Sequence, residues 1–232
     1  MPTIVFASPK GGAGKSTSAV VLATELAQRG ATVTVIDADP NHPVSQWAKR
    51  PGCPKTLTVL GAISEETIID TIEAASAKTS FVVVDLEGTA SMTVAYAISR
   101  ADLVVIPVQG SQLDAAEAAK AIRLIRQQEK AFARVIPYAV LFTRTSTAIK
   151  PRTFQHIRGE FADHGVPAFQ MQMHERDAFR AIFSFGGTLE SLDASQVSNV
   201  AAAVGNARAF AAEVITKLRQ DTNPATPAEV AS

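Results

Sequence analysis

Short apolar runs rich in valine and isoleucine alternate along the chain with longer stretches whose apolar residues recur at helical spacing. The short runs predict strands at residues 3–8, 31–39, 56–61, 80–88, 101–109, 134–144 and 166–173. The longer stretches predict helices at residues 16–30, 41–50, 64–78, 111–132, 151–165, 176–184 and roughly 195–220. Almost continuously apolar strands that alternate with helices are typical of parallel sheets. The pattern therefore predicts an α/β fold with a mostly parallel, twisted sheet flanked by helices on both faces.

The alternation runs to residue 220 without a linker or an internal repeat, so we expect one domain over residues 1–220. Residues 221–232 are polar and contain two prolines, and we expect this tail to be disordered. No apolar stretch reaches the roughly 18 residues of a membrane-spanning helix, and no signal-peptide pattern begins the chain. Cys53 is the only cysteine, which excludes a disulfide framework and fits a reducing compartment. The expected location is cytoplasmic.

Composition and charge narrow the partners only slightly. Hydrophobic residues make up 47% and charged residues 19% of the 232 residues, which is enough apolar material for a buried core. Basic and acidic residues number 22 each, so the overall charge gives no indication of a nucleic-acid partner. Any DNA binding must come from a local basic patch.

The stretch SPKGGAGKST, residues 8–17, lies between the first predicted strand and the first predicted helix. Its glycines let several backbone N–H groups point at one anion, and the dipole of the following helix adds positive potential. Lys15 supplies a charge for the β- and γ-phosphates, Ser16 a hydroxyl for Mg²⁺, and Thr17 a bond to the α-phosphate. The predicted nucleotide-binding residues of this stretch are Gly11, Gly12, Ala13, Gly14, Lys15, Ser16 and Thr17. The stretch predicts a P-loop NTPase although Pro9 replaces a usual glycine; a glycine-rich turn with solvated lysines is the alternative.

Acidic residues end two further predicted strands and should cluster with this loop, because ligands bind at the carboxyl ends of parallel strands. In VVVDLEG, Asp85 can hold Mg²⁺ through water, and a simple helix N-cap is the alternative. In IDADP, Asp37 and Asp39 point the same way. We expect Asp39 to orient the nucleophilic water or accept its proton, and Asp37 to contact the metal or a lysine. A turn-forming aspartate before proline is the alternative there. The predicted metal-site residues are Ser16, Asp37 and Asp85.

Taken in order, KGGAGKST, DADP and VVVDLEG resemble the ParA/MinD family of deviant Walker A ATPases, over roughly residues 1–215. The resemblance implies ATP and Mg²⁺ as cofactors and an ATP-sandwich homodimer in which Lys10 reaches the partner's phosphates. A lysine supplied in trans would neutralise charge as an arginine finger does, so hydrolysis would require dimerisation. The implied catalytic residues are Lys10, Lys15 and Asp39. Glu87 departs from the small or neutral residue usual at its position in the family.

The resemblance also implies that adenine lies near Thr143, Arg144 and residues 173–179, a run similar to smaller ParA-like proteins of plasmid partition and conjugative DNA transfer. ParA-like members bind DNA nonspecifically through basic side chains, and two clusters qualify. The first cluster contains Lys150, Arg152 and Arg158, with His156 beside them. The second contains Lys120, Arg123, Arg126, Lys130 and Arg134. An ordinary solvated face is the alternative for each.

We therefore expect a slow, partner-stimulated ParA-like ATPase that partitions or positions plasmid DNA or another cargo. Its expected partners are a second copy, nonspecific DNA, and a small ParB-like protein or cargo adaptor. No amphipathic membrane helix is expected at the C-terminus and no DNA-binding domain before the P-loop, and DNA binding would place the protein on the nucleoid. A nucleotide-dependent switch or scaffold with little turnover, as in conjugative DNA transfer, is the main alternative. A dethiobiotin synthetase-like ligase is disfavoured by Lys10 beside the glycine pair.

Overall fold

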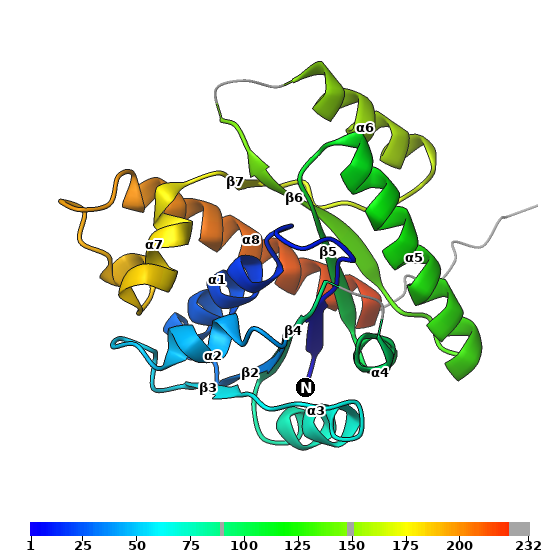
Figure 1. The fold of residues 1–232 in the computed structure, drawn as a ribbon, viewed down its shortest axis with the longest axis horizontal. Helices are drawn as coiled ribbons and strands as arrows, with labels where there is room; N and C mark the ends of the chain where they lie inside the picture. Colours follow the sequence, from blue (N-terminus) through cyan, green and yellow to red (C-terminus); the bar gives the residue numbers. More distant parts are fainter. Residues whose placement is uncertain (89–90, 148–150, 223–232) are drawn as a thin grey trace, which may run out of the picture.

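The computed structural model describes residues 1–88, 91–147 and 151–222. Within these ranges seven strands form one sheet in the order β3-β2-β4-β1-β5-β6-β7 (Figure 1). The strands are β1 (Thr3–Phe6), β2 (Val33–Ala38), β3 (Leu57–Leu60), β4 (Phe81–Leu86), β5 (Leu103–Val108), β6 (Tyr138–Thr145) and β7 (Met173–His174). Every neighbouring pair is parallel. The strands therefore all end at one side of the sheet, the carboxyl edge, and all begin at the opposite side, the amino edge.

Helices cover both faces of this sheet. One face is packed by α1 (Lys15–Gln28), α2 (Pro43–Ala48), α7 (Asp177–Phe185) and α8 (Val200–Thr222). The other is packed by α3 (Ile68–Ser76), α4 (Met92–Ser99), α5 (Gln112–Phe132) and α6 (Arg152–Asp163). Successive strand residues point to opposite faces, so Ile4 and Phe6 join the first core and Val5 the second. The predicted parallel α/β fold is confirmed.

The first strand occupies the middle of the sheet. Ile4 of β1 pairs with Val83 of β4 on one side and with Leu103 of β5 on the other. The chain leaves β1 for β2 on one side of the sheet and later crosses to β5 on the other side. The strand order reverses direction here, which is where ligands bind in open parallel sheets. The loop after β1 is therefore placed in the ligand crevice.

The strand predicted at residues 166–173 is wrong in most of its length. Only a bridge from Ala168 to Val140 and the two-residue β7 pair with β6. Between them the backbone N–H groups of Gln170 and Met171 donate to the Glu213 carboxylate, at 2.7 and 2.9 Å. A side chain of α8 thus replaces the ladder bonds that this segment would have made with β6.

Other boundaries differ for local reasons. The strand predicted from residue 134 begins at Tyr138, because the N–H of Ile136 donates to the Glu129 carboxylate instead. Helix α4 was not predicted; its Ser91 accepts a bond from the N–H of Val94 at 3.3 Å and caps it. Helix α8 continues two residues past the predicted domain boundary, and residues 223–232 of the expected tail lie outside the described residues. The single domain over residues 1–220 stays a prediction.

Candidate functional site

The loop between β1 and α1 is shaped as an anion cradle. Gly12 and Gly14 take positive φ angles of 75° and 98°, which side chains with a Cβ rarely adopt. Gly14 is also the N-cap residue of α1. The backbone N–H groups of residues 10–17 donate to no residue that the structure describes. Free N–H groups in a curved loop at a helix N-terminus form a phosphate-binding site.

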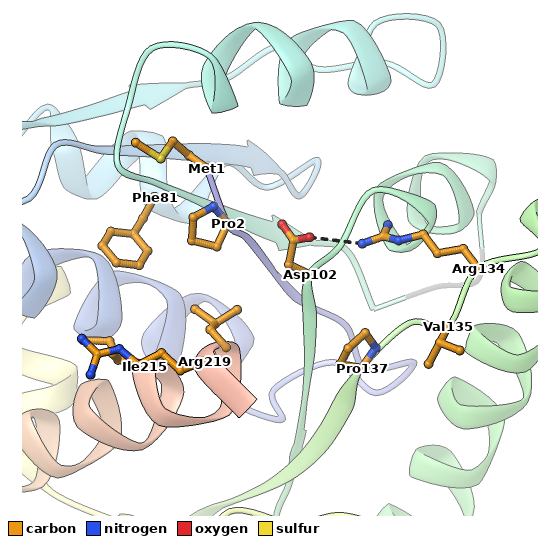
Figure 2. A pocket seen from close by; sticks show the side chains of 10 residues that line it. Met1, Pro2, Phe81, Asp102, Arg134, Val135, Pro137, Ile215 and Arg219 are labelled. Atoms are coloured by element: carbon orange, nitrogen blue, oxygen red, sulfur yellow. Dashed lines mark hydrogen bonds and ion pairs between the residues drawn. The ribbon is translucent and has the colours of Figure 1, made fainter. Parts of the chain in front are cut away.

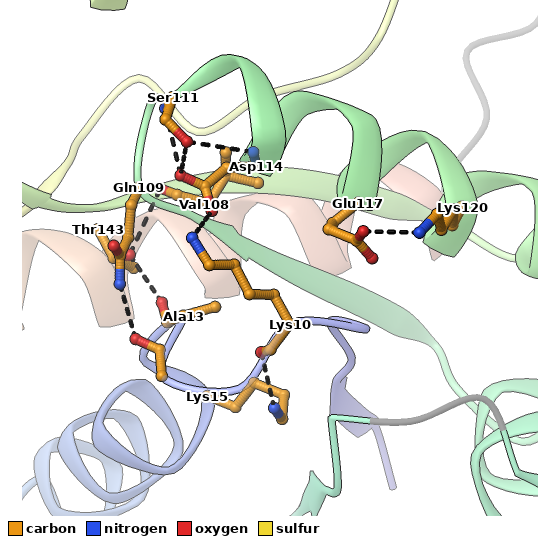
Figure 3. Close-up of polar contacts among 11 residues, drawn as sticks. Lys10, Ala13, Lys15, Val108, Gln109, Ser111, Asp114, Glu117, Lys120 and Thr143 are labelled. Atoms are coloured by element: carbon orange, nitrogen blue, oxygen red, sulfur yellow. Dashed lines mark hydrogen bonds and ion pairs between the residues drawn. The ribbon is translucent and has the colours of Figure 1, made fainter.

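The carbonyl groups of the same loop are held from outside. Gln109 donates from Nε2 to the carbonyl oxygen of Gly12 at 2.7 Å, and Thr143 donates from Oγ1 to that of Ala13 at 2.8 Å (Figure 3). Both side chains follow or end neighbouring strands, β5 and β6. The sheet thereby fixes the loop by its oxygens and leaves its nitrogens available. Thr143, which is predicted to lie near adenine, therefore also supports the loop through its bond to Ala13.

Lys15 lies in the cradle almost completely buried, with 6% of its surface exposed. Burial lowers the pKa of its ammonium group, while the charges of Asp85, Asp39 and Glu87 act in the opposite direction. Its Nζ lies 3.4 Å from the carbonyl oxygen of Lys10, a long hydrogen bond that leaves most of its donor capacity unused. A desolvated ammonium with unused donors is suited to bind phosphate oxygens.

Two buried carboxylates lie side by side beneath the loop. Asp37 of β2 pairs in register with Asp85 of β4, and neither has any exposed surface. Both side chains point to the face that α1 covers. They lie two residues after Val35 and Val83, which pack in the core on that face, and residues two apart in a strand point the same way. Burial is the main cause that raises the pKa of Asp85 to about 7, and the nearby Asp37 adds to it.

The unpaired oxygens of these acids fit a hydrated Mg²⁺ ion. Both oxygens of Asp85 and Oδ1 of Asp37 are buried without a hydrogen-bond partner among the described residues, whereas Oδ2 of Asp37 accepts from the N–H of Ser45 at 2.6 Å. The hydroxyl of Ser16 lies close enough to lower the pKa of Asp85, without meeting the geometry of a hydrogen bond. No group of three or more His, Cys, Asp or Glu residues within the described ranges forms a metal site by itself. Mg²⁺ therefore fits only together with water and phosphate oxygens, as is usual for this ion.

A pocket of about 460 Å³ opens above these groups. Asp39 lines it, and its Oδ1 accepts from the N–H and the side-chain amide of Asn41 at 2.8 and 3.0 Å. Its other oxygen makes no hydrogen bond to a described residue, so one face of the carboxylate remains for water. Glu87 lines the same pocket. The predicted loop residues Gly11, Gly12, Gly14, Lys15, Ser16 and Thr17 also line it, together with Arg144.

Gly88 links the segment after β4 to the phosphate loop. A Cβ atom added to Gly88 would lie 3.1 Å from the backbone nitrogen of Gly11 and 3.3 Å from the carbonyl carbon of Lys10. These distances are tighter than ordinary carbon contacts, so a side chain here would push the two segments apart. Glycine therefore allows the close approach, and the sequence alone did not reveal this contact.

A second, narrower pocket adjoins the first across Gly14 and Thr17. Arg144, at the end of β6, has a positive φ of 51°. Across the pocket His174 is hydrogen-bonded to Oγ1 of Thr145 at 2.8 Å. The remaining lining residues are Ser18, Thr143, Met173, Glu175, Arg176, Phe179 and Arg180. Thr143 and Arg144 thus line one pocket beside the phosphate loop, together with residues 173–176 and Phe179 of the predicted run.

Lys10 does not line the nucleotide pocket of its own chain. Its Nζ lies 2.6 Å from Oδ1 of Asp114 in the first turn of α5 (Figure 3). Asp114 is 3% exposed and forms a capping box with Ser111. Sequence reasoning missed Asp114, although Ser-x-x-Asp ahead of an apolar helix is a capping pattern that locates it.

The two basic clusters differ in which of their side chains form ion pairs. Within the second cluster Lys120 pairs with Glu117, Arg126 with Glu129, and Arg134 with Asp102. In the first cluster Arg152 and Arg158 are exposed on α6 and form no ion pair with a residue that the structure describes. Lys150 lies outside the described residues. Arg123 and Lys130 of the second cluster are likewise exposed without an ion pair among the described residues, so each cluster keeps two unpaired basic side chains.

The larger pocket of the molecule lies at the amino edge (Figure 2). It measures about 740 Å³ and is lined mainly by apolar side chains from the N-terminus, from the strand starts and from the last turns of α8. Arg134 crosses its rim to Asp102 at 3.1 Å and also donates to the carbonyl oxygens of Ser99 and Ala101. Asp102, the acid among its lining residues, is paired, and none of the lining residues is a glycine. No described helix is long and apolar enough to cross a membrane.

Comparisons with known proteins agree with this geometry. A family model described as VirC1 protein matches residues 1–220. The chain is 44% identical over 220 residues to Protein ParA of Rhizobium radiobacter, which covers 95% of this chain and 99% of the relative. It is 30% identical over 187 residues to Protein virC1 of Rhizobium rhizogenes, covering 78% of this chain and 80% of the relative. The ATP complex of McdA from Cyanothece has a TM-score of 0.75 over 92% of this chain and 96% of that chain; at 16% identity this shows the fold alone.

Proposed function

The chain belongs to the VirC1 family, and on that premise we propose that it is a ParA-like ATPase. It binds MgATP, forms an ATP-sandwich dimer, and binds DNA nonspecifically in that state. Hydrolysis resets the dimer, and the cycle partitions or positions plasmid DNA or another cargo. A small ParB-like protein or a cargo adaptor stimulates the turnover.

The free backbone N–H groups of residues 10–17 are the observation that carries this proposal. They face a pocket at a helix N-terminus and surround the buried ammonium of Lys15. Donors left unpaired at this density are satisfied by a polyanion. The adjoining pocket beside Arg144 and residues 173–176 accepts the base, because it continues from the loop without a break.

The acids at the carboxyl edge divide the remaining roles. Ser16, Asp37 and Asp85 would hold Mg²⁺, which when bound would supply positive charge beside the phosphates. Asp39 positions the attacking water with the carboxylate oxygen that Asn41 leaves free. Lys10 acts on the partner's phosphates, and its absence from the lining of its own pocket agrees with a role in trans.

DNA binding is assigned to the exposed guanidinium groups of α6. Arg152 and Arg158 make no ion pair within the described residues and lie on one helix. Each phosphate that such a group neutralises releases a counterion, so affinity should fall as salt rises. Lys150 precedes this helix and belongs to the same proposal. The paired charges of α5 are assigned no DNA role.

The test measures ATP hydrolysis and dimerisation together, with and without nonspecific duplex DNA. Wild type, Lys15→Ala and Arg152→Ala/Arg158→Ala are compared at several salt concentrations. We expect ATP-dependent dimers, loss of nucleotide binding in the first variant, and salt-sensitive DNA binding that the double variant weakens. Lys120→Ala is the matched control, since it removes a basic charge that Glu117 already neutralises. Full dimerisation and hydrolysis by the Lys15→Ala protein would contradict the proposal, and tight nucleotide binding without turnover would favour a switch or scaffold.

A further inference from the structure

Lys10 is the one P-loop residue whose side chain is committed elsewhere in the isolated chain. Figure 3 shows it extended toward the start of α5, while Lys15 lies on the other side of the loop. Its Nζ donates to Oδ1 of Asp114 at 2.6 Å, the length of a strong charge-assisted hydrogen bond. A lysine held in this position cannot at the same time reach the phosphates of a second copy.

The carboxylate that holds Lys10 is fixed independently of it. Oδ2 of Asp114 accepts from the hydroxyl of Ser111 at 2.5 Å and from its N–H at 3.2 Å. In return the hydroxyl of Ser111 accepts from the N–H of Asp114 at 3.2 Å. These bonds form the capping box of α5 and leave Oδ1 facing the P-loop. Asp114 is therefore a fixed acceptor, and Lys10 is the mobile partner.

Burial and exposure show which partner can leave. Asp114 is 3% exposed, whereas the side chain of Lys10 is 37% exposed. Burial opposes ionisation of Asp114, but the bonds from Lys10 and Ser111 hold its pKa below the ordinary value. Because two bonds from Ser111 remain after Lys10 leaves, the carboxylate keeps hydrogen-bond donors as partners when the lysine moves away. The contact is strong enough to hold Lys10 and still reversible.

We propose that Asp114 is a positioning residue for Lys10, which it retains in cis until a second copy docks. This inference rests on the proposed function, in which Lys10 acts on the partner's phosphates. Dimer assembly must then break the Lys10–Asp114 contact in each chain. Asp114 thereby sets the protein concentration at which active dimers form, without touching nucleotide.

The first experiment tests, in the absence of nucleotide, whether Asp114 holds Lys10 of the same chain. The apo protein is treated with an amine-acylating reagent, and the rate of modification at each lysine is followed by mass spectrometry. Lys10 should react about tenfold more slowly than in Asp114→Asn, the ratio expected for one charge-assisted bond of partly exposed groups. Lys120, whose pair with Glu117 is also 2.6 Å long but more exposed, is the internal reference. Equal rates at Lys10 in both proteins would overturn the proposal.

The second experiment measures dimerisation with a non-hydrolysable ATP analogue by sedimentation. Asp114→Asn should dimerise at about tenfold lower protein concentration, since no bond must be broken. Its turnover at saturating protein should equal that of wild type, and its monomer affinity for nucleotide should not change. Asp114→Glu should restore the wild-type dimerisation. Weaker dimerisation or lower turnover in Asp114→Asn would overturn the proposal, because Asp114 would then support the productive position of Lys10.

Two control variants separate this role from helix stability. Ser111→Ala removes the hydroxyl that fixes Asp114 but leaves Oδ1 for Lys10, so dimerisation should tighten less than in Asp114→Asn. Glu117→Gln removes an ion pair of the same length on the same helix and should change nothing. Tighter dimerisation of Glu117→Gln, or as much tightening in Ser111→Ala as in Asp114→Asn, would show a general effect of α5 and overturn the assignment. Failure of wild type to dimerise would refute the proposed function, while the acylation result still decides whether Asp114 retains Lys10.

Discussion

At the amino edge of the sheet, Arg134 and Asp102 meet with their bonds filled, whereas at the carboxyl edge Asp37 and Asp85 are fully buried with unpaired oxygens. Arg134 donates to two carbonyl groups besides Asp102, and the second oxygen of Asp102 accepts from the N–H of Thr3 at 2.8 Å. Polar groups at the amino edge thus bond to each other.

This difference between the two edges indicates that the carboxyl edge is less favourable for folding and more suitable for binding a ligand. A buried carboxylate without partners opposes folding, so it persists where a ligand supplies the missing contacts. The size of a pocket does not carry this information, because the larger pocket lies at the amino edge, where Asp102 and Arg134 are paired. The Nε of Arg100 at the amino edge is also buried without a partner, so it is the unpaired buried carboxylates, found among the described residues only at Asp37 and Asp85, that mark the site.

The largest expected effect comes from removing one basic side chain at each edge, Lys10 at the carboxyl edge and Arg134 at the amino edge. Lys10→Ala should lower turnover by roughly a thousandfold, as loss of a charge supplied in trans does. Nucleotide affinity should persist, since Lys10 does not line the pocket. Arg134→Ala at the amino edge should leave turnover per dimer unchanged. Single-turnover hydrolysis and equilibrium nucleotide binding measure both, and equal losses in the two variants would show that the edges do not differ in function.

The second prediction concerns the stability of the metal-free protein. Burial raises the pKa of Asp85 to about 7, so between the unfolded pKa near 3.8 and that value the folded state binds more protons. Stability from this group is therefore lost as pH rises through 7. Asp85→Asn should raise the free energy of unfolding at pH 8.5 by about 2–4 kcal/mol and change it little at pH 4. Urea unfolding in EDTA measures this, and the same variant should lose Mg²⁺-dependent hydrolysis. No gain in stability at high pH would show that burying the Asp85 carboxylate does not destabilise the fold.

The matching change at the amino edge should have the opposite sign. Asp102→Asn removes the charge that Arg134 contacts, and both side chains are more than a third exposed. We expect a loss of about 1 kcal/mol in the free energy of unfolding. Urea unfolding under the same conditions as for Asp85→Asn gives the direct comparison. A stabilised Asp102→Asn protein would show that neither edge is optimised for stability.

The smallest effect lies beside the pocket assigned to the base. Burial, followed by the charge of Arg176, lowers the pKa of His174, so the unfolded state takes up the proton first as pH falls below about 6.5. Stability from this group is present above that pH and is lost below it. Wild type should therefore lose roughly 1–2 °C more in Tm between pH 7.5 and 5.5 than His174→Gln. Identical pH profiles in thermal scans would remove His174 from the electrostatics of this pocket.

Residues within one short motif could be predicted from the sequence, because a few neighbouring positions supply both the functional groups and their spacing. The loop around Lys15 and the acids Asp37, Asp39 and Asp85 lie together at the carboxyl edge as predicted, since parallel strands end together. Their roles in metal binding and water activation stay predictions. Thr143 and Arg144 were taken from the resemblance, and they line the adjoining pocket.

Contacts between distant segments could not be predicted. Gln109 contacts the P-loop from the residue after β5 and Asp114 contacts it from α5, and no periodicity indicates which loop carbonyl or lysine they meet. The strand expected at residues 166–173 failed because Glu213 takes its N–H groups, a competition visible only once α8 is in place. Local patterns thus predict the helices, the strands and the residues of the P-loop and its acids. The side chains that support the loop, such as Gln109, depend on tertiary packing.

The central place of β1 has a consequence during synthesis. Its partners on both sides, β4 and β5, follow it by some eighty to a hundred residues, as the pairs of Ile4 with Val83 and Leu103 show. At roughly 5–20 residues per second, a ribosome delivers the first of these partners about 4–16 s after β1. Throughout that interval β1 has two open edges, and the glycine loop after it has no neighbouring strand to hold its carbonyls. The loop gains its supports from Gln109 and Thr143 only after the ribosome has made the segments that contain β5 and β6.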